Sequence, residues 1–498
     1  MANRYWVGGT GSWSDAANHW SDASGGTPGA GNLPTSSDDA IFDANSASGA
    51  YIVTVNGSPT VVNLTYTGLA NKTDRLLLSG SLTVTGILTV NGNSATNRVL
   101  IRSSVLGTAR TITAATVSIS NADFQDITGA GTGSWNLSAV SSGDCGGNSN
   151  ITFTVAADQH WTNVNGGDWS DSANWTSRVP LPQDNVLMDC AFGTSKTVII
   201  DMPRAGKNID WTGATWTTSL TWQTSSCTIF GGIKLINGLT TTVTSTIITL
   251  SGRASYNIDT LGVSVVFAFT VAAPSGTYTL QNDFVSTGSN GIQVSNGTFD
   301  CNNKNITAAS FGSNYPYTRS IIMASGTITL TSSSNGWSIN DLTGLTFDAG
   351  TSTIKYTNTN NNNMTFTGGG LTYNNVWFSR GASTGNITIV DSNTFNDFKD
   401  DGTAAHSLLF TAGTTQTVTT FTVSGTAGNL ITINSTTTAT HALTKTGGGT
   451  ISCDYLNIQH SVATPSNTWH AGKNSVNNQA IATAGSGWIF PNNFFLLF

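Results

Sequence analysis

The chain has 498 residues, of which only 9% are charged and 38% are hydrophobic, and its formal net charge is -7. All 26 acidic residues are Asp, and Glu is absent. Because Glu and Lys favour exposed helix faces and are depleted from strands, this composition excludes coiled coils and helical bundles. The 14 Trp and 21 Phe residues supply too much apolar surface for a disordered chain. We predict an all-β protein with little or no α-helix.

The charge pattern and the beginning of the chain weigh against three further classes. The 19 basic residues form no cluster, so nucleic-acid binding is not expected. No apolar run is long enough to span a bilayer, and residues 1–6 contain no apolar signal core, so we expect neither membrane insertion nor Sec-type export. The five scattered cysteines and six dispersed histidines lack metal-ligand spacing. We therefore expect free buried thiols, no metal and no cofactor.

A Trp-rich head opens the chain and recurs near residue 161. Both copies read as a Trp, a glycine turn, WSD, AN and a further Trp, and alternating strand sequence follows each copy. This duplication predicts two Trp-headed β modules, residues 1–157 and 158–290, before a C-terminal β-helix of residues 291–498. The head residues are Trp6, Trp13, Asp15, Asn18, Trp20, Trp161, Trp169, Asp171, Asn174 and Trp175.

Two interpretations of the heads are open. Indole rings stack on sugars and Asp or Asn oxygens suit calcium, so a head could be a binding site. Alternatively, the Trp rings cover the open end of a stack of strands while Asp and Asn bind turn backbone. We favour structural caps, because each head precedes strands and lacks the ligand spacing of a calcium loop.

Toward the C-terminus, apolar strand centres recur at intervals of 19 to 23 residues, at Phe347, Phe366, Ile389, Phe410, Ile433 and Leu456. Such intervals match one coil of a solenoid rather than the strand spacing of a sandwich. We predict a right-handed parallel β-helix, with Asn358 and residues 360–363 as a turn or an asparagine ladder. Trp469 and Trp488 are expected to cap its C-terminal end.

Three Asp residues are the candidates for catalysis, although no defined catalytic pattern surrounds them. Glycoside hydrolysis usually needs two carboxylates, and without Glu only Asp could serve. Asp397, Asp400 and Asp401, around Lys399, form the best charged cluster in the C-terminal half, and Arg380 is the cation that we propose as a partner for Asp397. The alternative is a solvated turn at an Asp-Gly step. We lean toward a protein that is not an enzyme.

Trp211, Trp216 and Trp222 are the candidate aromatic platform for glycans. Their spacings of five and six residues differ in parity, so one unbroken strand cannot present all three on one side. Packing in the core is the alternative.

Several passages resemble phage-encoded and metagenomic β-helix virion appendage proteins of the tail-fibre or spike type. They include RYWVGGTGSW from residue 4, GDCGGNSNITFT from residue 143, FNDFKDDGTAAHSLLF from residue 395, and TWHAG and GWIF near the end. The head alone is also similar to heads of autotransporter-type passenger domains. The resemblance implies a virion structural protein (tail fibre, spike or decoration) that is assembled in a host cytoplasm and exposed on the particle.

Three functions follow as hypotheses. The first is a rigid virion appendage that joins other virion proteins and binds host surface polysaccharide; we expect a homo-oligomer, and a homotrimer follows by analogy alone. The second is a polysaccharide-cleaving tailspike enzyme. The third is a bacterial surface adhesin that resembles a passenger domain. A neutral surface rich in Thr, Asn and Gly suits receptor binding and host attachment without strong charge attraction.

Deletion of the apolar C-terminal residues tests whether they form a subunit interface. These residues are Phe494, Phe495, Leu496, Leu497 and Phe498. Apolar surface costs about 25 cal/mol per Å² in water, so a partner is expected to cover them. The deleted chain should form smaller assemblies in size-exclusion chromatography with light scattering, and an unchanged oligomer would contradict the interface.

Overall fold

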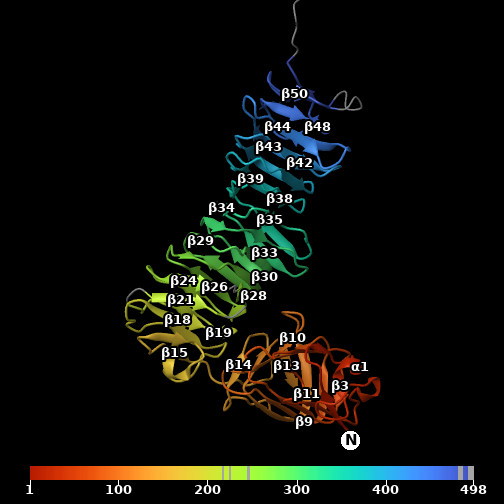
Figure 1. Ribbon diagram of the computed structural model, residues 1–498, viewed down its shortest axis with the longest axis vertical. Coiled ribbons are helices and arrows are strands. Elements are labelled where there is room, and N and C mark those ends of the chain that lie inside the picture. Colours follow the sequence, from red (N-terminus) through yellow and green to blue (C-terminus); the bar gives the residue numbers. More distant parts are fainter. Residues whose placement is uncertain (216–217, 224–225, 244–246, 480–485, 492–498) are drawn as a thin grey trace, which may run out of the picture. The chain divides into compact units, whose positions relative to one another are not determined.

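A computed structural model describes residues 1–215, 218–223, 226–243, 247–479 and 486–491. It confirms the all-β prediction: the chain forms a β-solenoid of about 19 turns, with 47% strand and 2% helix (Figure 1). The described helices are α1 (Ala16–His19), η1 (Ala30–Asn32) and η2 (Ser172–Asn174). The chain divides into unit 1, residues 1–259 and 272–277, and unit 2, residues 260–271 and 278–498.

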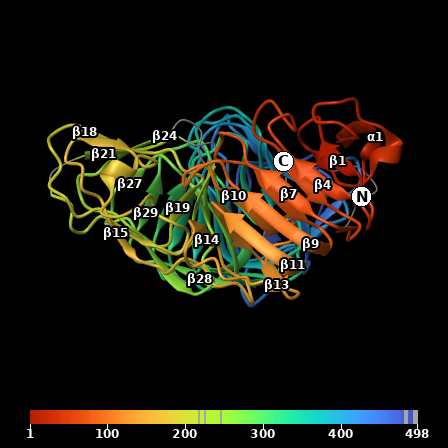
Figure 2. The same cartoon turned by 90° about the horizontal axis from the view of Figure 1, so that it is seen from below.

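The first part of unit 1 contains two sheets. The larger sheet follows the order β13 (Ile127–Ala130), β11 (Arg110–Ser120), β9 (Leu82–Asn91), β7 (Leu64–Thr67), β4 (Asp39–Phe42), β1 (Asn3–Trp6) and β3 (Trp20–Ser21), and β6 (Thr60–Val61) pairs with β9. The smaller sheet follows the order β14 (Ser142–Asp144), β12 (Ala122–Gln125), β10 (Val99–Ser103), β8 (Arg75–Leu78), β5 (Ile52–Val55) and β2 (Gly11–Ser12). Figure 2 shows β4, β7, β9 and β11 side by side.

The second part of unit 1 also contains two rows of strands. One row is β15 (Asp158–His160), β17 (Asn185–Leu187), β19 (Arg204–Gly206), β20 (Ile209–Asp210), β22 (Ser226–Ile229), β23 (Ile233–Lys234), β25 (Ile247–Leu250) and β26 (Ser255–Asp259). The other is β16 (Gly166–Asp168), β18 (Lys196–Ile200), β21 (Thr218–Trp222) and β24 (Thr240–Val243). Strand β28 (Phe269–Leu280) has residues in both units.

Unit 2 contains three rows of strands. The first is β30 (Ile292–Asp300), β32 (Phe311–Gly312), β33 (Arg319–Ile322), β35 (Asn335–Ser338), β36 (Leu345–Asp348), β38 (Met364–Thr367), β40 (Ile387–Val390), β42 (His406–Phe410), β44 (Ile431–Ser435), β47 (Leu456–Ile458) and β50 (Val476–Asn477). The second is β27 (Ser264–Val265), β29 (Phe284–Ser286), β31 (Ile306–Ala308), β34 (Thr327–Leu330), β37 (Thr353–Tyr356), β39 (Thr372–Phe378), β41 (Thr394–Asp400), β43 (Thr415–Val423), β45 (His441–Lys445) and β48 (Ser461–Thr464). The third is β46 (Ile451–Ser452), β49 (Trp469–His470) and β51 (Trp488–Ile489).

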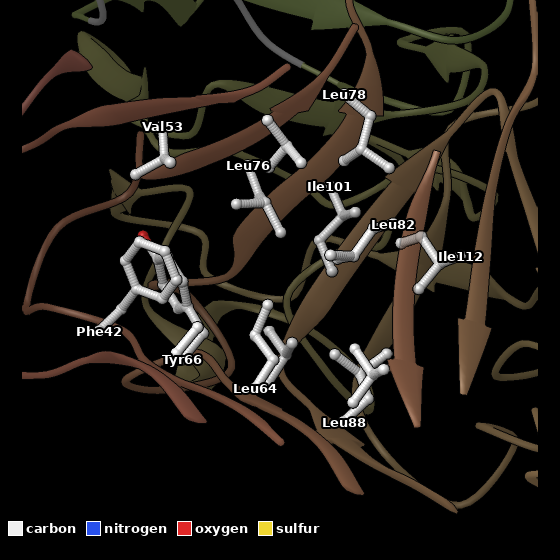
Figure 3. Close-up of a cluster of buried hydrophobic side chains, with 14 of the residues drawn as sticks. Phe42, Val53, Leu64, Tyr66, Leu76, Leu78, Leu82, Leu88, Ile101 and Ile112 are labelled. Carbon is white, nitrogen blue, oxygen red and sulfur yellow. The ribbon is translucent and has the colours of Figure 1, made fainter. Parts of the chain in front are cut away.

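In-register parallel pairing builds the core. In unit 1, Val53 pairs with Leu76, Leu76 with Ile101, and Ile101 with Phe124 on successive strands, and each of these side chains is almost fully buried. Figure 3 shows the inward side chains that result. Strand residues alternate between faces, so one inward position per coil stacks on the next and forms a continuous apolar column.

The predicted coil interval is present in unit 2. Phe366 pairs in parallel register with Ile389, and Ile389 with Phe410, although these residues are 23 and 21 positions apart. All three side chains are fully buried. The regular spacing in the sequence therefore marks successive coils of the solenoid.

The two Trp heads share one geometry. Trp20 packs edge-on against Trp13 with ring centroids 4.8 Å apart, and its Nε1 donates to the Trp13 carbonyl over 2.7 Å. Trp175 packs against Trp169 at the same distance of 4.8 Å and donates to the Trp169 carbonyl over 2.8 Å. A third ring completes each cluster. The ring centroid of Trp6 lies 5.2 Å from that of Trp20, and the ring centroid of Trp161 lies 5.0 Å from that of Trp175. The duplication therefore encodes one aromatic cluster built twice.

The heads fit the cap interpretation, and their rings cannot stack on a sugar because all six are at most 5% exposed. Asn18 donates to the Asp15 carboxylate, the Asp171 carboxylate accepts from Ala173 N, and Asn174 donates to the Asp168 carbonyl. These short-range bonds hold the turns between the rings. At the other end, buried Trp469 and Trp488 pack 5.2 Å apart, in the place where a C-terminal cap was expected.

Substitution of Trp20 by Ala tests the first cap. Removing a fully buried Trp side chain should lower the free energy of unfolding by about 3–5 kcal/mol, because the cavity takes one packing partner from each of three other aromatic rings. Urea unfolding followed by Trp fluorescence measures this change. The matched control is Ile87→Ala, since Ile87 is 47% exposed in the same part of unit 1. Equal midpoints for the two variants would contradict a capping role.

Candidate functional site

The structure does not bring the three candidate Asp carboxylates together. In β41, Phe398 and Asp400 point into the core, whereas Asp397 lies on the outer face, where its Oδ1 accepts a hydrogen bond from the Thr420 hydroxyl over 2.5 Å. Asp401 is exposed, with its carboxylate 3.7 Å from the Lys399 ammonium. A glycosidase needs both carboxylates beside one bond, and the inward-facing Asp400 cannot supply one of them.

Asp400 instead forms a buried pair with His406. Its Oδ2 lies 2.7 Å from His406 Nε2, its Oδ1 accepts from Gly402 N over 2.9 Å, and both side chains are at most 3% exposed. Burial lowers the pKa of His406, but the hydrogen bond and charge of Asp400 outweigh it, so the net pKa is raised. A polysaccharide cannot reach these buried atoms. The pair instead holds the turn after β41, where Asp400 also binds the backbone of Gly402.

Arg380 does not pair with Asp397. Its guanidinium is buried and donates to the carbonyls of Asn358, Asn360, Asn362 and Gly385, over 2.7 to 3.1 Å. The predicted asparagine turn is thus folded around one arginine.

The predicted aromatic platform is wrong for two of its three residues. Trp211 and Trp222 are 0% exposed and pack in the core, as the alternative interpretation expects. Trp222 ends β21 on the same face as Leu220, so strand alternation turns it inward. Trp216 and the apolar residues 494–498 lie outside the described residues.

A different Trp lies on the outer face of unit 2. Trp377 is half-buried, whereas every other Trp that the structure describes is buried. The Lys355 ammonium lies 3.8 Å from the centroid of the Trp377 ring, and the Lys399 ammonium lies 4.0 Å from the ring centroid. Both lysines pair directly with Trp377 on the neighbouring strands β37 and β41. We call Lys355, Trp377 and Lys399 the outer ladder.

The outer ladder was missed by the sequence analysis, although a signal existed. Its members are each 22 residues apart, which is one coil of the solenoid. Searching for charged and aromatic residues at the coil period would have found it. A ring held between two ammonium groups is a cation–π arrangement, which fixes both cations and leaves them half-buried at the surface.

A second charged group lies in unit 1, around Asp123. The Asp123 carboxylate is fully buried and accepts from Arg98 Nε over 2.8 Å and from Arg204 Nε. Arg204 also donates to the Arg98 carbonyl over 2.9 Å. Asp123 and Arg98 precede Arg204 by 81 and 106 residues in the chain, so no local sequence motif predicts the cluster.

The described residues offer little for metal or thiol chemistry. They contain no group of three or more His, Cys or Asp side chains that could hold a metal ion. All five cysteines are free; four are buried and Cys190 is half-buried. Burial raises the pKa of the Cys190 thiol to about 11, so it stays protonated near neutral pH.

No helix in the described part of the chain is both long and apolar enough to cross a membrane. In the comparisons with known proteins, no family model, no curated protein and no solved structure matches the chain.

Two buried histidines should give unit 2 opposing pH dependences. His441 stacks on Phe410 with ring centroids 4.6 Å apart, and neither ring nitrogen has a hydrogen-bond partner in the structure as described. Burial, with a smaller effect of His460, lowers the pKa of His441 to about 3. The unfolded chain takes up this proton below about pH 6.5 and the folded chain does not, so acid destabilises the fold. His406, with its raised pKa, stabilises the fold below about pH 6.5 and loses that contribution as pH rises through its folded pKa.

Variants separate the two effects. Lowering pH from 8 to 5 should cost about 2 kcal/mol through His441, and His441→Leu should remove this loss. His406→Gln should steepen the loss in acid instead. Urea unfolding of each variant at several pH values measures the slopes. A slope for His441→Leu equal to that of the unchanged chain would show that His441 does not stay neutral in the fold.

Proposed function

We propose that this chain is a structural appendage protein of a bacteriophage virion, a tail fibre, spike or decoration that presents a rigid β-solenoid to the host surface. The observation that carries the proposal is the solenoid with aromatic clusters near its ends. Such a fold hides its strand edges and needs no bound group to complete its core. The assignment to a virion rests on the resemblance of its sequence passages to phage β-helix proteins.

Hydrogen bonds between side chains on neighbouring coils support a rigid role. Uncharged side chains bond at one coil spacing, as in Asn208 to Asn185 over 2.9 Å, Asn478 to Asn457 over 2.7 Å, and Thr221 to Thr242 over 2.6 Å. These ladders join exposed or half-buried positions without charge. A surface of this kind keeps its shape when salt or pH changes, because screening acts on charges and not on neutral hydrogen bonds.

The outer ladder is the proposed contact with host glycans. The Lys355 and Lys399 ammonium groups both lie against the Trp377 indole, on a chain whose formal net charge is -7. Charge complementarity favours polysaccharides that carry carboxylates, such as uronic acid polymers. The nearby Asp401 carboxylate, 3.7 Å from Lys399, leaves Lys355 as the stronger of the two contacts.

The proposal also includes partners: the chain contacts other virion proteins and forms a homo-oligomer, a trimer by analogy. Repeated copies would multiply weak glycan contacts through avidity. The separation of Asp397 from the buried Asp400 weighs against a polysaccharide-cleaving tailspike. A bacterial adhesin would share the fold but would be found on the cell rather than on the particle.

Two measurements test this function. Mass spectrometry and a density map of purified phage particles should find the chain in the virion, and its absence there would overturn the appendage assignment. Full-length protein should bind alginate, an acidic probe, better than dextran, a neutral one. Trp377→Ala and Lys355→Gln should each weaken alginate binding about three- to tenfold, the range of one cation–π contact.

The control for the ladder is Thr329→Ala, which alters the residue paired with Lys355 on the preceding strand. Equal alginate binding by the control and Trp377→Ala would reject the ladder as the contact. Release of reducing ends from the polysaccharide, lost in Asp397→Ala or Asp401→Ala, would favour the enzyme instead.

A further inference from the structure

An arginine-lined cavity lies in unit 1. It has a volume of about 150 Å³, and three guanidinium groups line it, those of Arg75, Arg102 and Arg204. Arg75 in β8 and Arg102 in β10 lie on the face of their sheet opposite Leu76 and Ile101, which point into the core. Residues with hydroxyl side chains in β22 and β25 also line the cavity, namely Ser226, Thr228 and Thr249.

The lining is strongly cationic. No acidic side chain is among the described residues that line the cavity. The nearby Asp123 carboxylate already binds both Arg98 and Arg204, so one negative charge is shared between two guanidinium groups. Cations gathered in a partly buried space repel one another unless an anion joins them.

Arg75 shows this most directly. Its Nε is buried and has no hydrogen-bond partner within the described residues. Burial lowers the pKa of Arg75, and the positive charges of Arg102 and Arg204 lower it further. A buried donor without a partner indicates that a water or an ion belongs beside it.

We infer that this cavity binds a tetrahedral oxyanion, phosphate or sulfate, between Arg75, Arg102 and Arg204. Guanidinium groups donate two parallel hydrogen bonds to such an anion, which a single ammonium cannot do. The volume has room for an ion the size of a few water molecules. The anion can be a free ion or the sulfate group of a sugar.

The bound anion would join the two Trp-headed parts of unit 1. Arg75 and Arg102 come from the first part, and Arg204 from the second, 129 residues after Arg75. The apolar contact beside the cavity is small and consists of Leu100, Cys145 and Phe230. The oxyanion thus adds a charge-dependent link where apolar packing is limited, and this role does not depend on the proposed function.

Thermal unfolding of the full chain tests the site. Sodium sulfate and sodium phosphate should raise the midpoint temperature of unit 1 by about 2–4 °C over sodium chloride at equal ionic strength. Arg75→Met and Arg102→Met should each reduce this shift and weaken sulfate binding, measured by calorimetry, at least about tenfold. The matched control is Arg110→Met, since Arg110 is also half-buried but does not line the cavity.

The same variants keep the test clear of folding defects. Without an oxyanion, Arg75→Met should unfold no lower than the unchanged chain, because it removes repulsion among like charges. Binding of galactose 6-sulfate more tightly than of free sulfate would assign the anion to a sugar, and the reverse order would assign it to a free ion. The inference is overturned if neither sulfate nor phosphate exceeds chloride, or if Arg75→Met retains the full shift.

Discussion

The fold depends on the stacking of inward apolar side chains from one parallel coil onto the next. Each coil buries only a few residues, so no coil could exclude water alone, and Val53, Leu76 and Ile101 come from three successive coils. Stacking turns these sets into one column, and the column requires a nearly constant number of residues per coil. The first and last coils still have open ends, and the Trp clusters lie there because large rings cover the most area per residue.

The same register also aligns what points outward. Residues one coil apart are brought to hydrogen-bonding or stacking distance, so a polar or charged position repeated at 22 residues becomes a surface ladder. Asn and Thr form most of the ladders described above, which suits a surface that should be stiff and uncharged. Lys355, Trp377 and Lys399 use the same register for a different chemistry, because it places each lysine one coil from the aromatic ring and the two lysines two coils from each other.

Because the chain has few charged residues, the partners of its buried arginines are restricted. Where few acids exist, a buried arginine must bind backbone carbonyls, as Arg380 does, or share a carboxylate, as Arg98 and Arg204 share Asp123. The proposed appendage function draws on the neutral surface and the rigid core, whereas the proposed oxyanion site draws on three arginines that line one cavity in unit 1. The two conclusions therefore rest on separate parts of the chain and on separate physical features.

The sequence by itself determined the all-β class, the duplicated heads, the coil interval and the Trp positions that form the aromatic clusters. These are local properties, since composition, strand alternation and repeat spacing can be read within one coil or between equivalent positions. Only the tertiary structure decided that Asp400 turns inward while Asp397 turns outward, that Trp211 and Trp222 are core residues, and that Arg75 meets Arg204. A shift of one position reverses the face of a strand residue, and contacts between distant coils depend on how whole sheets pack, so neither follows from local pattern.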